Sequence, residues 1–186
     1  MKRLLDIVVS LTALILLSPL LVVVAIAIKI DSPGPALFWS QRFGGDGHLF
    51  WMPKFRTMRT DAPQLPTHLL SVSVNLLTRT GPFLRKSSLD ELPQLWSVLI
   101  GTMSLVGPRP ALFNQGDLIE MRQQNASASL RPGITGWAQI NGRDTLTLEN
   151  KVALDEEYSE RQSLLFDLYI LAMTTIRVMK SDSISH

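Results

Sequence analysis

The chain starts with a long apolar stretch, residues 7–28, which constrains its folding more than any other feature. The polar side chains within this stretch are Ser10, Thr12 and Ser18. As a straight α-helix the stretch would measure about 33 Å, which matches a hydrocarbon core of about 30 Å. Hydropathy alone therefore predicts a helix that spans a membrane.

A proline lies just past the middle of this stretch, at Ser18-Pro19. Because proline removes an amide donor and clashes with the preceding turn, we expect a kink there. Three interpretations follow: a kinked spanning helix, a re-entrant helix whose two limbs bend back at Ser18-Pro19, or a cleaved signal peptide. Lys2, Arg3 and Lys29 flank both ends, so the positive-inside rule does not separate the first two. The run exceeds the usual signal-peptide core of about 7–15 residues, which disfavours the third.

Size and composition limit what the rest of the chain can be. The 186 residues suffice for one ordinary domain beside an anchor. The proline-rich break at residues 32–35 predicts a membrane anchor over residues 1–31 and a second domain over residues 32–186. The absence of cysteine excludes disulfides, a thiolate nucleophile and cysteine-bound metals. A net charge of +2 gives no indication of nucleic-acid binding, and we expect no nucleic-acid partner.

The second domain combines strand and helix patterns, so we predict an α+β fold that is mainly helical. Residues 37–41 and 49–55 flank the glycine-rich segment 44–47, which predicts a β-hairpin. Trp39 and Trp51 on this hairpin suit either a membrane interface or the core. Residues 61–78 are interpreted as a loop that leads into a short helix.

The C-terminal part has the periodicity of a helix. The apolar residues that recur there at about 3.6-residue spacing are Leu165, Leu168, Ala172, Ile176 and Met179. Such a stripe is more typical of core packing than of membrane contact, although an interfacial helix is the alternative.

Two adjacent acids, Asp90 and Glu91, stand at the start of another apolar segment. Ser88 followed by Glu91 has the spacing of a capping box, which predicts that both carboxylates lie in the first turn of a helix running through Leu95 and Leu99. The positive end of the helix dipole favours ionised acids there, and metals or phosphates bound to them. An ionised Asp can attack phosphorus, and a neighbouring Glu can hold a divalent cation or move a proton. The alternative is that Ser88 and Glu91 only cap the helix.

Several cationic residues accompany these acids along the chain. Arg109 stands between Pro108 and Pro110, so a stiff loop presents a planar guanidinium that suits a phosphate or a base edge. Each such feature taken alone is more typical of an ordinary solvated surface. The other cations considered as ligands are Lys54, Arg56, Arg85, and, in a glycine-punctuated segment, Arg131 and Arg143.

Taken in order, these motifs resemble the bacterial sugar transferase family, the monotopic polyprenyl-phosphate phosphoglycosyl transferases. The resemblance runs from Lys2 to about Ile176, and its length resembles the minimal form of the family. The segments that carry it include residues 54–58, 88–94, 104–110 and 131–136, which read KFRTM, SLDELPQ, SLVGPRP and RPGITG.

The resemblance implies roles that the residues alone do not assign. It implies a re-entrant helix bent at Ser18-Pro19, interfacial amphipathic helices, and a cytosolic catalytic domain on the bacterial inner membrane. Asp90 would be the nucleophile that forms a phosphosugar–aspartate intermediate, with Glu91 beside it and with Mg²⁺ held by both acids. The Pro108-Arg109-Pro110 segment would bind the nucleotide and Arg85 a phosphate. Substrate contacts are also expected from Lys54, Arg56, Arg131 and Arg143.

The implied activity is transfer of a sugar 1-phosphate from a UDP-sugar to undecaprenyl phosphate, which releases UMP and initiates polysaccharide or glycoconjugate synthesis. Its partners would be a nucleotide sugar, a polyprenyl phosphate, membrane lipids and a second copy of the chain. The rival interpretation is a non-catalytic, single-pass module that binds lipid headgroups or a protein. That interpretation explains the anchor and the basic clusters, but it requires neither the adjacent acids nor the rigid Arg109 loop.

Overall fold

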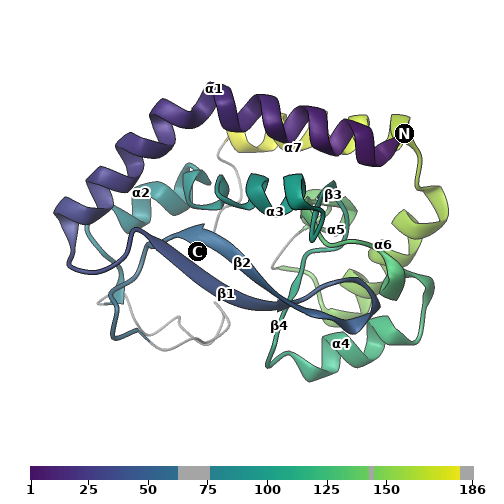
Figure 1. Cartoon of the computed structure of the whole chain (residues 1–186). Coiled ribbons are helices and arrows are strands. Elements are labelled where there is room, and N and C mark those ends of the chain that lie inside the picture. Colours follow the sequence, from purple (N-terminus) through teal and green to yellow (C-terminus); the bar gives the residue numbers. More distant parts are fainter. Residues whose placement is uncertain (63–75, 143–144, 181–186) are drawn as a thin grey trace.

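The computed structural model describes residues 1–62, 76–142 and 145–180 (Figure 1). It confirms a mixed architecture in which helices predominate over two small sheets. The helices are α1 (Lys2–Asp31), α2 (Gly81–Lys86), α3 (Gln94–Ile100), α4 (Gly116–Gln123), α5 (Trp137–Ile140), α6 (Leu148–Arg161) and α7 (Leu164–Lys180). The strands are β1 (Leu37–Phe43), β2 (Leu49–Phe55), β3 (Ser104–Val106), β4 (Ala111–Leu112) and β5 (Gly133–Thr135).

The predicted hairpin is confirmed, and its first strand is two residues longer than expected. β1 and β2 pair antiparallel from Leu37 opposite Phe55 to Phe43 opposite Leu49, and β4 adds to the outer edge of β1. Gly47 in the connecting turn has a φ of +72°, a conformation that glycine adopts without strain. Trp39 and Trp51 are both about half exposed on this hairpin, so neither belongs to the core. Most of the segment 61–78 lies outside the described residues.

The second sheet brings two loops together. β3 and β5 pair in parallel, so the loops that follow them leave from the same edge. The backbones approach closely there: a Cβ on Gly136 would lie 2.1 Å from the carbonyl oxygen of Gly107. A residue with a side chain does not fit at Gly136, and the Gly107-Pro108 turn therefore sits directly against the start of α5.

Helix α1 is long and apolar enough to cross a membrane, and within the described ranges it is the one helix with this property. Its exposed side chains are mostly Leu, Ile and Val, whereas its few buried ones include Asp6 and Ser10. Both Asp6 oxygens bind β3, at the Ser104 hydroxyl (2.9 Å) and the Leu105 amide (3.0 Å). A helix that buries polar groups and exposes apolar ones is built for apolar surroundings.

Side-chain bonds fasten both ends of α1 to the rest of the chain. At the first end the Lys2 ammonium donates to the Asp167 carboxylate of α7 at 2.7 Å and to the Val106 carbonyl of β3 at 2.9 Å. At the other end Asp31 accepts bonds from the amide and hydroxyl of Thr80, at 2.8 and 2.7 Å. The two ends therefore dock on one compact body, which consists of the hairpin, the short helices and α7.

The C-terminal helix is confirmed, but its packing differs from the expectation. The core side of α7 consists of Phe166, Asp167 and Ile170, which are all buried. The predicted core stripe faces outward instead, with Leu165, Leu168 and Ile176 exposed. The core interpretation of that stripe is therefore wrong. Asp167 takes the inward position because Lys2 and the Tyr158 hydroxyl bind its carboxylate there.

Candidate active site

The two adjacent acids lie on a tight turn between α2 and α3. Leu89–Glu91 form a single 3₁₀ turn, and Ser88 before it has a φ of +55° and makes no side-chain cap. The α-helix begins only at Gln94, after Pro93. The capping-box prediction is therefore wrong. Pro93 has no amide to donate, and two cationic side chains bind the Glu91 carboxylate in place of the helix end.

Glu91 joins three parts of the fold. Its Oε1 accepts a bond from the Lys54 ammonium on β2 at 2.9 Å and from the Arg109 guanidinium at 3.3 Å. The Glu91 and Lys54 side chains are each only 15% exposed, and that of Arg109 is 33% exposed. The hairpin, the acid turn and the loop after β3 therefore meet at one carboxylate.

Asp90 stands in the same charged surroundings. Burial raises the pKa of its carboxyl above the ordinary 3.8, against the opposing effect of the Lys54, Arg85 and Arg109 charges. Burial likewise lowers the pKa of the Lys54 ammonium, and the nearby Glu91 charge counteracts this effect. Arg85 is oriented by a bond from its Nε to the Thr57 hydroxyl at 3.0 Å. Asp90 is thus a partly desolvated carboxylate among cations, which suits a nucleophile.

A further cation, Arg42, belongs to this cluster although the sequence did not single it out. Burial and the neighbouring Arg109 charge lower the pKa of Arg42 to about 10, and Glu91 raises it. Its position follows from the pairing of β1 with β4, a tertiary contact that no local motif signals. The cations around the acid pair, Arg42, Lys54, Arg85 and Arg109, outnumber the two carboxylates, so the site attracts anions.

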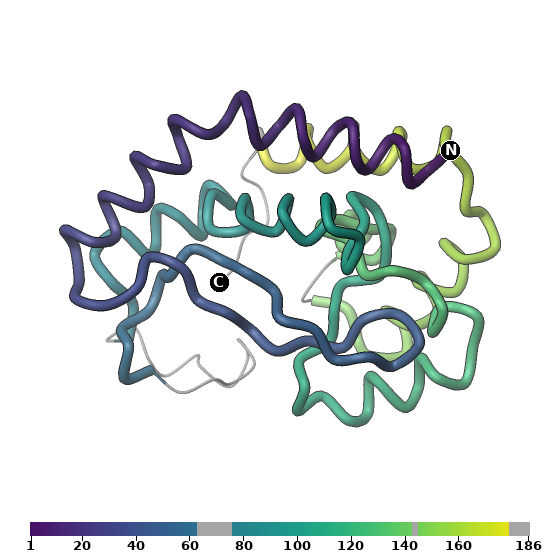
Figure 2. Tube along the Cα trace, viewed as in Figure 1, coloured from purple at the N-terminus to yellow at the C-terminus, as the bar shows by residue number. Residues whose placement is uncertain are grey.

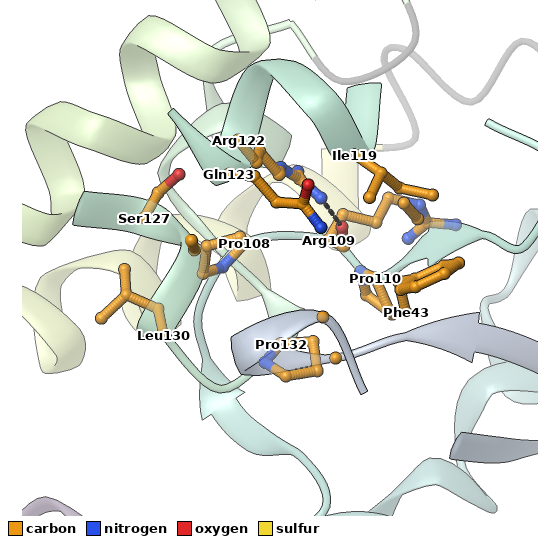
Figure 3. Close-up of a pocket in the computed structure, with 14 residues that line it drawn as sticks. Phe43, Pro108, Arg109, Pro110, Ile119, Arg122, Gln123, Ser127, Leu130 and Pro132 are labelled. Carbon is orange, nitrogen blue, oxygen red and sulfur yellow. Dashed lines mark hydrogen bonds between the residues drawn. The ribbon is translucent and has the colours of Figure 1, made fainter. Parts of the chain in front are cut away.

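The loop after β3, here called the Pro-Arg-Pro loop (Pro108, Arg109 and Pro110), borders a hollow that opens to solvent (Figure 3). The walls come from the loop itself, from the hairpin turn and from α4 and the segment after it. The lining residues include Phe43, Pro108, Arg109, Ile119, Arg122 and Pro132. Arg109 belongs to both places, since it lines the hollow and reaches Glu91. Arg109 therefore links the hollow to the acid pair.

The structure brings some of the predicted ligands together and leaves others apart. Lys54, Arg85 and the Pro-Arg-Pro loop surround the acids, as described above. Arg56 does not join them: it is 5% exposed, and it donates to the carbonyls of Pro33 (2.6 Å) and Ser32 (2.9 Å) after α1. Arg131 is exposed on the approach to β5, next to Pro132 of the hollow. Arg143 lies outside the described residues.

The acid pair also offers ligands to a hard cation. Mg²⁺ in phosphate-binding sites usually takes one or two protein carboxylates and completes its shell with water and substrate phosphates. Asp90 and Glu91 supply that number of carboxylates. Within the described part of the chain no cluster of three or more Asp, Glu or His side chains could hold a metal without a substrate. Asp90 and Glu91 could therefore supply the protein ligands of a magnesium ion whose other ligands are water and a substrate phosphate.

The chain is similar to known sugar transferases over almost its whole length. The family model described as bacterial sugar transferase matches residues 1–181. The UDP-glucose:undecaprenyl-phosphate glucose-1-phosphate transferases of Xanthomonas campestris pv. campestris and Escherichia coli K12 are 39% and 41% identical over 186 residues. The matches cover 96% and 95% of this chain but only 38% and 40% of those proteins. The uncharacterized sugar transferase EpsL of Bacillus subtilis is 40% identical, covering 99% of this chain and 90% of EpsL.

Proposed function

Since this chain belongs to the bacterial sugar transferase family, we propose that it transfers a sugar 1-phosphate from a UDP-sugar to undecaprenyl phosphate and releases UMP. The observation that carries this proposal is the partly buried acid pair among four cations, beside a hollow lined by the Pro-Arg-Pro loop. The non-catalytic alternative requires none of this arrangement.

The proposed reaction has two displacements at one phosphorus. A carboxylate oxygen of Asp90 attacks the phosphorus that carries the sugar, and the bond from that phosphorus to the UMP oxygen breaks. A phosphate oxygen of undecaprenyl phosphate then attacks the same phosphorus, and the bond to Asp90 breaks. This sequence yields undecaprenyl-diphosphate-sugar and regenerates the free carboxylate. One site can thus serve a water-soluble donor and a lipid acceptor in turn.

The surrounding residues take roles that follow from their placement. Arg85 and Lys54 stand beside Asp90 and would neutralise the diphosphate as the carboxylate approaches. Arg109 would contact both the diphosphate and the nucleoside, because it spans the acid pair and the hollow. Asp90 and Glu91 would hold Mg²⁺, which would withdraw charge from the phosphate oxygens.

The proposal places the chain on the cytoplasmic face of the inner membrane, with α1 re-entrant. Support comes from the two ends of α1, which dock on the same body through Lys2 and Asp31. The trace of α1 also changes direction between its ends, and Pro19 lies within the helix (Figure 2). A freed carbonyl near the proline, that of Ile15, accepts a bond from the Ser18 hydroxyl at 2.8 Å. A straight helix of 30 residues would hold its two ends about 45 Å apart, and a bend at Pro19 brings them closer together.

The test uses the purified full chain in detergent with radiolabelled UDP-glucose. Without acceptor, we expect one burst of UMP and a covalent sugar phosphate on Asp90, detectable by mass spectrometry. Undecaprenyl phosphate should discharge this adduct and start multiple turnovers, and Asp90→Asn should give neither burst nor adduct. Lipid product that accumulates without any adduct would contradict the covalent route. A panel of other UDP-sugars identifies the donor, and release of UMP from none of them would favour the anchored binding module.

A further inference from the structure

The Pro-Arg-Pro loop is held by its backbone as well as by its prolines. Its three successive carbonyls accept hydrogen bonds from three different elements. The Pro108 carbonyl binds the Gly133 amide at 2.9 Å, the Arg109 carbonyl binds the Arg122 guanidinium at 2.8 Å, and the Pro110 carbonyl binds Arg42 at 3.2 Å. With every carbonyl engaged, the loop cannot rotate a peptide group without losing a bond.

The central bond depends on a second contact farther from the hollow. Arg122 on α4 donates through Nε and Nη2 to one oxygen of Asp155 on α6, at 3.0 and 2.6 Å. Asp155 is 1% exposed, and the Arg122 side chain is 13% exposed. The two charges compensate each other, so the pair adds nothing to the net charge of the acid cluster. The bond from Arg122 to the Arg109 carbonyl connects this pair to the Pro-Arg-Pro loop.

We propose that Arg122 and Asp155 are positioning residues that hold the Pro-Arg-Pro loop in the conformation that binds the nucleoside part of the donor. Figure 3 shows Arg122 beside the hollow, with its bond to the Arg109 carbonyl drawn. Each of the three side-chain nitrogens of Arg122 donates to a protein oxygen, and Asp155 does not line the hollow. This inference rests on the proposed function, because it assigns the hollow to the nucleotide.

The test measures UMP affinity by isothermal titration calorimetry, and the steady-state kcat and KM for the UDP-sugar. Arg122→Lys keeps the charge but cannot bind Asp155 and the Arg109 carbonyl with a planar fork. We expect UMP affinity to fall and donor KM to rise by about 5- to 10-fold, the size of one lost hydrogen bond, with kcat changed by less than about twofold. Asp155→Asn should shift both values in the same direction by a smaller factor. Arg59→Lys, which alters an exposed Arg–Asp pair away from the hollow, should leave both values unchanged.

The design separates positioning from a purely structural role. Neither KM nor the dissociation constant depends on the fraction of molecules that is folded, whereas the apparent kcat does. A variant that merely folds poorly would lower kcat and leave KM and UMP affinity at the parent values, and this result would overturn the inference. If the parent chain itself neither binds UMP nor releases it from any UDP-sugar, the proposed function fails instead.

Discussion

The two adjacent acids should respond in opposite ways to the same isosteric change. Burial raises the pKa of Asp90, so the ionised carboxylate destabilises the folded state. The attraction of the neighbouring cations offsets this effect only in part. Asp90→Asn removes this charge while preserving its shape. We therefore expect a higher melting temperature for Asp90→Asn at neutral pH, together with a loss of UMP release of about 10³-fold or more.

Glu91→Gln should instead destabilise the protein. The change leaves the Lys54 ammonium, on a side chain only 15% exposed, without its carboxylate partner. Removing one member of a buried ion pair costs about 3–5 kcal/mol. Because Asp90 also lies near Lys54, we expect about 2–3 kcal/mol here. At about 2–4 °C per kcal/mol for a chain of this size, the melting temperature should fall by about 4–12 °C.

The stability of the parent and of Asp90→Asn should depend differently on pH. In the folded state Asp90 binds its proton more tightly than in the unfolded chain, so the free energy of unfolding decreases as the pH rises through the raised pKa. The gain in stability of Asp90→Asn over the parent should therefore be complete at neutral pH and should vanish below the ordinary pKa of 3.8. Melting curves in detergent, followed by tryptophan fluorescence, measure both variants. A melting temperature of Asp90→Asn below that of the parent at pH 7, or an unchanged one for Glu91→Gln, would refute the electrostatic account.

Four further changes test other parts of the account. Pro19→Ala should shift α1 toward a spanning helix, because the bend loses its proline; cysteine labels at both ends that still react from one side would contradict this. EDTA should stop UMP release and added Mg²⁺ should restore it, whereas release indifferent to chelation would exclude a divalent metal from the step. UMP release should decline as the pH falls through the raised pKa of Asp90, and a rate that is constant down to the ordinary 3.8 would argue against this nucleophile. Arg56→Lys should lower the melting temperature without changing donor KM, since the Arg56 guanidinium binds the carbonyls of Ser32 and Pro33. A higher donor KM would instead indicate that Arg56 binds the substrate.

Local patterns predicted those parts of the fold that local rules govern. The hairpin follows from strand residues on either side of a glycine turn, and the long first helix follows from hydropathy. The adjacent acids Asp90 and Glu91 could be predicted as a candidate site because they too form a local sequence pattern. The capping box failed because its rule covers one helix end, whereas Glu91 is held by Lys54 from another strand and by Arg109 from another loop.

The residues that sequence reasoning missed owe their place to tertiary contacts. Arg42 comes to the acids through strand pairing, and Arg122 comes to the Pro-Arg-Pro loop through its ion pair with Asp155. Neither residue lies in a motif or near the acids in the chain. Conversely, Arg56 belongs to a basic segment that suggested a ligand, yet its guanidinium points to the end of α1. The presence of a cationic residue in the sequence does not show which oxygen atoms its side chain will bind.

The apolar stripe of α7 lies on its exposed side. In a water-soluble helix the apolar stripe marks the buried side, and that rule placed Leu165, Leu168 and Ile176 in the core. In the structure the buried side contains Asp167, which Lys2 of α1 binds, while the apolar stripe is exposed. Helix α1 shows the same inversion, with Asp6 buried and leucines outside. Two helices joined by the Lys2–Asp167 ion pair therefore both turn apolar surface outward. An exposed apolar surface of this kind is typical of a membrane or protein interface, and the location of α7 at the membrane interface stays a prediction.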